Sequence, residues 1–162
     1  MNNVKTLVIH PYIKTSRGNK DLLLNEAICL AQAIELRCIF STSVGIDRVN
    51  PKTYFKSGYV SYLKEKVTEL DIKLLFINTN LSPIQQRNLE TNINCKIIDR
   101  TGLILEIFGS RARSNEGKLS VSLASLQFQK SRLVRSWTHL ERQRGGVGFM
   151  GGPGEKQIES DR

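Results

Sequence analysis

Apolar and polar positions follow two periodicities over the first 98 residues. Residues 4–10, 37–44 and 72–78 form short β-rich runs, whereas residues 21–36 and 57–70 place apolar side chains at helical spacing. The run at 72–78 is almost continuously apolar, which is typical of a strand covered on both faces. The alternation predicts an α/β fold in which a small parallel sheet is flanked by helices.

Short polar signals mark where these elements begin and end. Ser82, Pro83 and Gln85 stand where a capping box with proline at the first helical position needs them. Asn19 can cap the helix that follows it. A fourth strand is predicted at 95–98, and Asp99 closes it. Asp99 either caps the next helix or has a functional role at the edge of the sheet. The cap is the favoured interpretation.

The strand signals stop after residue 98. Residues 102–112 predict one helix and residues 116–144 a much longer one, roughly 40 Å at 1.5 Å per residue. Two series of residues spaced seven apart along it form an a/d-like seam that needs a partner helix or a surface. One series is Leu119, Leu126, Leu133 and Leu140, and the other is Leu123, Lys130 and Trp137, in which Lys130 is a charged interruption. We therefore expect an α/β subdomain over 1–98 and a helical subdomain over 99–162.

The end of the chain is rich in glycine. Residues 145–154 hold six of the 12 glycines, a density that neither a helix nor a strand tolerates. Residues 155–162 are compatible with a helix but stop after two turns. The pattern predicts a long-helix hairpin with a Gly-rich tip at 145–154 and a truncated return helix at 155–162.

Common catalytic and cofactor patterns are not found. Residues 146–151 read G-x-G-x-x-G, yet a basic helix end precedes them, where a dinucleotide site needs a strand. The phosphate-loop pattern G-x-x-x-x-G-K-[ST] is absent. His10 and His139 have no evident catalytic partners in the sequence. We interpret His10 as a structural or surface residue. No cluster of ligands suits zinc. We expect no catalytic site, cofactor or metal in this chain.

The positive charge is concentrated in one part of the chain. The formal net charge is +9, and residues 109–144 carry eight basic side chains against two acidic ones. Arginine makes bidentate phosphate contacts, glycine lets backbone amides approach a ligand closely, and Phe149 can stack on an unpaired base. These features predict contact with RNA, with a solvated helix face as the alternative.

The apolar runs, the start of the sequence and the cysteines indicate in which cellular compartment the protein lies. No apolar run reaches the roughly 18 residues of a membrane span, and no secretory signal is evident. The cysteines are odd in number and lie in apolar runs, where cysteine usually behaves as a small hydrophobe. They are Cys29, Cys38 and Cys95. We expect a cytoplasmic protein without a disulfide framework.

Several segments resemble the N-terminal region of the HflX family of ribosome-associated GTPases. They are residues 82–90, 99–108 and 111–119, together with 137–155, which resembles the hairpin and Gly-rich loop of that family, and 157–162, which resembles the start of its return helix. The resemblance implies an α/β part and a two-helix part, followed in the full-length family by a domain that binds GTP and Mg. It also implies binding to the large ribosomal subunit and GTP-dependent splitting of stalled ribosomes under stress.

The resemblance also implies which residues contact RNA, since the family's hairpin tip reaches toward the peptidyl-transferase centre. Together with the arginines before the tip, the expected ribosome-binding residues are Arg132, Arg135, Arg142, Arg144, Gly145, Gly146, Gly148, Phe149, Gly151 and Gly152.

The chain departs from the family pattern at some positions and leaves other functions open. Where the family often has Gly-Ser-Gly-Lys, this chain has Lys56, Ser57, Gly58 and Tyr59, and the GTPase domain is missing. Three alternatives remain. The chain is a module that packs on and restrains a GTPase domain in cis or in trans, an enzyme with a nucleotide in its α/β part, or a non-functional fragment of a split gene.

Overall fold

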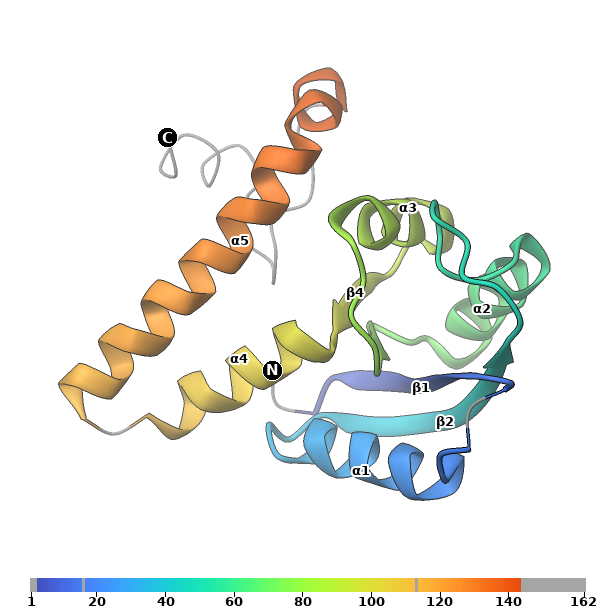
Figure 1. The fold of residues 1–162 in the computed structure, drawn as a ribbon, viewed down its shortest axis with the longest axis horizontal. Helices are drawn as coiled ribbons and strands as arrows, with labels where there is room; N and C mark the ends of the chain where they lie inside the picture. Colours follow the sequence, from blue (N-terminus) through green and yellow to red (C-terminus); the bar gives the residue numbers. More distant parts are fainter. Residues whose placement is uncertain (1–2, 16, 113, 144–162) are drawn as a thin grey trace.

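A computed structural model of the chain describes residues 3–15, 17–112 and 114–143, with side chains as far as Lys130. Strands and helices alternate as the sequence predicts, and a long helix follows them (Figure 1). The elements are β1 (Lys5–Ile13), α1 (Lys20–Gln32), β2 (Arg37–Ile46), α2 (Ser57–Leu70), β3 (Leu74–Ile77), α3 (Pro83–Ile93), β4 (Lys96–Asp99), α4 (Arg100–Arg111) and α5 (Asn115–Gln143).

The four strands form one parallel sheet in the order β2-β1-β3-β4. All four residues of β3 are buried, which confirms the strand that the apolar run predicts. β1 runs three residues beyond the predicted end at His10, because β2 continues beside it and pairs Ile13 with Ile46. The second neighbour, β3, pairs only with Thr6–Ile9.

Two layers of helices cover the two faces of the sheet. On one face, Leu7 and Ile9 of β1 pack in a core with residues of α2 and α3 such as Leu63 and Leu89. On the other face, Val8 packs with residues of α1 and α4 such as Ala27 and Leu103. Alternate residues of β1 therefore supply both cores, as expected of a central strand. The predicted α/β fold class is confirmed.

Local signals set most helix boundaries. The Asn19 side chain accepts hydrogen bonds from the first turn of α1, and Ser82 and Gln85 form the predicted capping box of α3. The helix predicted over 21–36 instead ends at Gln32, because Glu35 adopts φ 61° and the Leu36 N–H bonds to the Ala31 carbonyl. This is a Schellman-type ending that turns the chain into β2 while keeping Leu36 buried.

Asp99 joins the sheet to α4. One carboxylate oxygen accepts a hydrogen bond from the Gly102 N–H at 2.9 Å, and the other accepts one from the Leu81 N–H at 3.2 Å. The side chain is only 1% exposed. Asp99 is thus the N-cap of α4, as favoured from the sequence, and the same carboxylate holds the loop before α3.

Helix α5 begins where Ser114 caps it and extends past the sheet, packing on α4 and α3 (Figure 1). Gly109 of α4 faces Val121 of α5, since a Cβ added at Gly109 would lie 3.7 Å from the Val121 Cγ1 atom. The long helix predicted over 116–144 is confirmed as far as Gln143. The Gly-rich loop at 145–154 and the return helix at 155–162 lie outside the described residues.

We expect Asp99→Ala to lower the free energy of unfolding by about 2–4 kcal/mol, because it removes a helix cap and leaves a second buried N–H without its acceptor. Urea unfolding measures the change. Asn19→Ala removes an exposed cap and should cost only about 1 kcal/mol. Equal losses from the two substitutions would show that the buried carboxylate has no special role.

Candidate nucleic-acid interface

Three of the ten predicted RNA-contact residues lie on α5, and the other seven follow this helix in the sequence. The backbone of α5 carries Arg132, Arg135 and Arg142, whose side chains lie beyond the described ones. The other predicted contact residues lie outside the described residues altogether: Arg144, Gly145, Gly146, Gly148, Phe149, Gly151 and Gly152. Their contact with RNA stays a prediction.

The described part of the basic region is exposed. Arg111 ends α4, and Lys118 and Lys130 lie on α5, all three with exposed side chains. Exposed cations of one sign attract nucleic acid over distance even where they make no direct contact. The described start of the leucine seam is exposed as well, at 60% for Leu119 and 52% each for Leu123 and Leu126. In the described residues, nothing buries this stretch of the seam.

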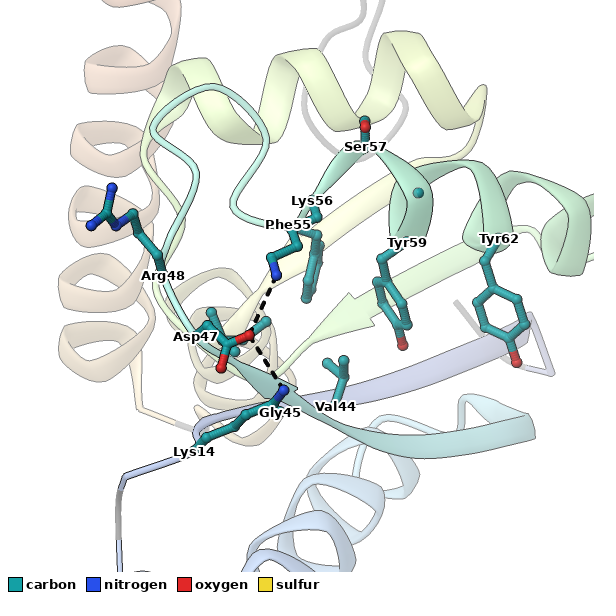
Figure 2. Close-up of a pocket in the computed structure, with 12 residues that line it drawn as sticks. Lys14, Val44, Gly45, Asp47, Arg48, Phe55, Lys56, Ser57, Tyr59 and Tyr62 are labelled. Atoms are coloured by element: carbon teal, nitrogen blue, oxygen red, sulfur yellow. Dashed lines mark hydrogen bonds and ion pairs between the residues drawn. The ribbon is translucent and has the colours of Figure 1, made fainter.

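The α/β part holds a pocket that sequence reasoning did not find. It lies between the end of β2 and the first turns of α2, with a volume of about 570 Å³ (Figure 2). Its walls combine basic, acidic and aromatic side chains with the apolar Val44 and Ile46. The only hint in the sequence is the departure from the family pattern at Lys56–Tyr59, which forms the α2 side of the pocket.

A shared carboxylate organises the basic side of the pocket. The Nζ atoms of Lys14 and Lys56 each lie 3.3 Å from the Asp47 Oδ2 atom. Hydrogen bonds from Lys14 and then Lys56 lower the pKa of Asp47, so this carboxylate stays ionised at neutral pH. The two ammonium groups therefore converge on one point at the mouth of the pocket (Figure 2).

Aromatic rings form the opposite wall. The ring centroids of Phe55 and Tyr59 are 5.1 Å apart, and those of Tyr59 and Tyr62 are 5.5 Å apart. Figure 2 shows the two tyrosine rings hanging from α2 toward β2. Phe55 is buried beside Tyr59, whereas Tyr62, on the other side of Tyr59, is 39% exposed. Burial, with a smaller contribution from the neighbouring Tyr62, raises the pKa of Tyr59, so its hydroxyl stays protonated.

A second polar cluster lies where β3 ends beside β1. The Nδ2 atom of Asn78 is 3.1 Å from the Nδ1 atom of His10, and Arg100 donates a hydrogen bond of 3.0 Å to the Asn78 Oδ1 atom. His10 is buried, and its Nε2 atom has no hydrogen-bond partner among the described residues. Burial and then the charge of Arg100 lower the pKa of His10, whereas Glu26 opposes them. Of the two interpretations of His10, the structure supports the structural one.

The described residues offer little else for chemistry. Among them, no group of three His, Cys, Asp or Glu side chains is placed to hold a metal ion, and no helix has the length and apolarity of a membrane span. Cys38 and Cys95 are half-buried free thiols, and burial raises the pKa of Cys95 to about 12. Cys29, expected to behave as a small hydrophobe, is exposed: α1 buries Ala27 and Ala31, and Cys29 lies on the opposite side of the helix.

Comparison with known proteins places the chain in a family. Residues 22–109 match the family described as "GTP-binding GTPase N-terminal", and residues 111–162 match "GTP-binding GTPase Middle Region". Over 149 residues the chain is 52% identical to the GTPase HflX of Magnetococcus marinus. The chain belongs to the HflX family of GTPases. The family resemblance inferred from the sequence is confirmed.

The chain spans about a third of the length of these HflX relatives. The match to the M. marinus protein covers 92% of this chain and 34% of the relative. The GTPase HflX of Escherichia coli K12 is 40% identical over 158 residues, which cover 98% of this chain and 36% of that protein. A GTP-binding protein from Sulfolobus solfataricus, solved in complex with GDP, gives a TM-score of 0.63 at 21% identity, covering 98% of this chain and 45% of that one. It supports the α/β fold class.

The buried His10 should make stability depend on pH. Because its folded-state pKa lies below the unfolded value near 6.5, the unfolded chain binds the proton first as the pH falls. The free energy of unfolding should therefore drop below about pH 6.5 until the folded-state pKa is passed. In the variant His10→Gln this contribution should be absent. Urea unfolding of both proteins over this pH range measures it, and identical pH slopes would contradict it.

Proposed function

We propose that this chain is the ribosome-binding N-terminal domain of an HflX-type GTP-binding protein and that it docks on large-subunit ribosomal RNA through its basic helical hairpin. The observation that carries the proposal is the family match over 22–109 and 111–162, which includes the basic helix and the Gly-rich segment after it. In this proposal the whole protein splits or rescues stalled ribosomes in the cytoplasm, using GTP and Mg.

The shape and charge of α5 support docking at a distance from the sheet. The helix has 29 residues, about 40 Å at 1.5 Å per residue, and it contacts the rest of the molecule through α4 and α3. Its exposed lysines lead toward Arg142, Arg144 and the glycines beyond them. A narrow cationic element followed by small residues suits the phosphate-lined spaces of folded RNA.

Hydrolysis of GTP belongs to another domain in this proposal. The chain contains no G-x-x-x-x-G-K-[ST] phosphate loop, so we expect no GTPase activity from it alone. The relatives that it matches are named GTPases and extend well beyond the matched third. A GTPase domain, in cis or in trans, would supply the bound nucleotide and Mg.

One observation favours a second candidate function, a module that packs on and restrains a GTPase domain. The leucines Leu119, Leu123 and Leu126 leave an apolar stripe on α5, and Phe108 of α4 is 56% exposed. If a GTPase domain covers this stripe, adding the chain to a separate GTPase domain should slow GTP turnover. Leu123→Glu should abolish that effect. Turnover that the wild-type chain leaves unchanged would exclude this function.

We expect Arg142→Glu combined with Arg144→Glu to weaken binding to large ribosomal subunits by at least roughly ten-fold. Each lost phosphate contact should also lower the slope of log affinity against log salt by about one unit. Co-sedimentation of the chain with purified subunits over a range of salt concentrations measures both quantities.

A matched control distinguishes a specific contact of the hairpin from a general effect of net charge on binding. Lys52→Glu combined with Lys64→Glu makes the same change in net charge on exposed residues of the α/β part. This variant should bind large subunits with nearly wild-type affinity. If both double variants lose affinity equally, the hairpin is not the specific contact.

A further inference from the structure

The two edges of the sheet differ in length. β2 and β4 are the outer strands in the order β2-β1-β3-β4. β4 has 4 residues, whereas β2 has 10 and pairs with β1 from Arg37 to Ile46. Among the described residues, no strand pairs with the outer side of β2. An edge strand of this length is a template for pairing with another chain.

The hydrogen bonds between β2 and β1 show which backbone groups of β2 point outward. The Ile46 carbonyl accepts a hydrogen bond of 3.1 Å from the Lys14 N–H, so the backbone groups of Ile46 face β1. Successive residues of a strand direct these groups to opposite sides, and those of Ser41 and Ser43 therefore point away from the sheet. The Thr42 hydroxyl donates to the Ser43 carbonyl at 3.2 Å. A carbonyl has two lone pairs, so it can accept a second hydrogen bond.

β2 lacks most of the features by which edge strands avoid such pairing. Its residues from Cys38 to Ile46 include no charged side chain and no proline, the two residue types that commonly block an edge. A shift in the register with β1 after Cys38 is its one irregularity. Phe40 and Val44 are only partly buried, so apolar surface lies beside the outward backbone groups.

The charges at the two ends of β2 favour one partner. Arg37 begins the strand and Asp47 follows it, both are exposed, and Thr42 lies midway between them. We propose that β2 pairs antiparallel with β2 of a second copy of this chain, about a two-fold axis at Thr42. Arg37 of each copy then lies next to Asp47 of the other, so the two ends are complementary in charge. The proposal does not rest on ribosome binding.

An axis at Thr42 suits the backbone as well as the charges. The outward groups of Ser41 meet those of Ser43 in the other copy, and the two residues can exchange both of their backbone hydrogen bonds. Moving the axis to Ser41 would instead bring Asp47 toward Glu35, and like charges opposite each other are destabilising. The ends of the strand therefore select the register.

The side chains and helices of the two copies are compatible with this pairing. On the side of the sheet covered by α2, Phe40 of one copy faces Val44 of the other. Helix α5 packs on α4 and α3, which contact β4 at the opposite edge, so both copies of α5 stay free (Figure 1). One pair of strands buries less area than a standard interface, and the dimer should therefore be weak and dependent on concentration.

Sedimentation velocity of the full chain over a range of concentrations tests the proposal. We expect the fraction of dimer to rise with concentration. Arg37→Glu places like charges opposite each other at both ends of the interface and should weaken association at least roughly five-fold at low salt. Asp47→Lys should weaken association similarly, because the introduced positive charge lies opposite Arg37. Lys118→Glu, a matched charge change on an exposed residue of α5, should stay within about two-fold of wild type.

A mixture of the two edge variants gives a sharper test. In a heterodimer of Arg37→Glu with Asp47→Lys, both ends again join opposite charges. The mixture should therefore associate within about two-fold of wild type, although each variant alone associates weakly. Circular dichroism and thermal melting verify that each variant is folded. Damage within a single copy cannot be corrected by mixing, so failure of the mixture to restore association would overturn the pairing.

Amide hydrogen exchange tests whether the contact lies on the edge of the strand. The amides of Ser41 and Ser43 should become more protected as the concentration rises, whereas the amide of Thr42, which faces β1, should change little. A chain that stays monomeric at all concentrations would overturn the proposal, as would a dimer in which Ser41 and Ser43 gain no protection. Either result would leave the hairpin proposal standing, because co-sedimentation with ribosomal subunits measures it separately.

Discussion

Burial of β1 and β3 between two helix layers is the constraint on which the rest of the molecule depends. β1 sends Leu7 and Ile9 into one core and Val8 into the other, and all four residues of β3 are buried. The backbone N–H and C=O groups of such buried strands can form hydrogen bonds only with neighbouring strands. This requirement maintains the order of the strands in the sheet. Two of the buried polar side chains, Asn78 and Asp99, lie where β3 and β4 end.

A polar group at the end of β4 determines where the next helix begins. Asp99 leaves β4 and caps α4, while the same carboxylate holds the loop that leads into α3. Because α4 packs on the sheet, and α5 packs on both α4 and α3, the long helix is held against the α/β part by two helices. The proposed docking on RNA would benefit from such a base, since a loosely tethered helix would lose more entropy on binding.

Local chemistry explains which features the sequence predicted well. The range 57–70 predicted for a helix coincides with α2 at both ends, and the Ser82 capping box and the Asp99 cap depend on neighbouring residues only. The end of α1 was missed because Glu35 adopts a left-handed conformation that no strong glycine or proline signal announces. The pocket was missed for a different reason. Lys14, Asp47 and Lys56 meet only when β1, β2 and α2 are assembled.

The most direct measurement of ribosomal docking is the binding of the purified chain to isolated large and small ribosomal subunits as salt is increased. Saturable binding to the large subunit, much weaker binding to the small subunit and a log affinity that falls by several units per decade of salt are the expected results. Equal binding to both subunits, or no binding of the folded chain even at low salt, would contradict the proposed function.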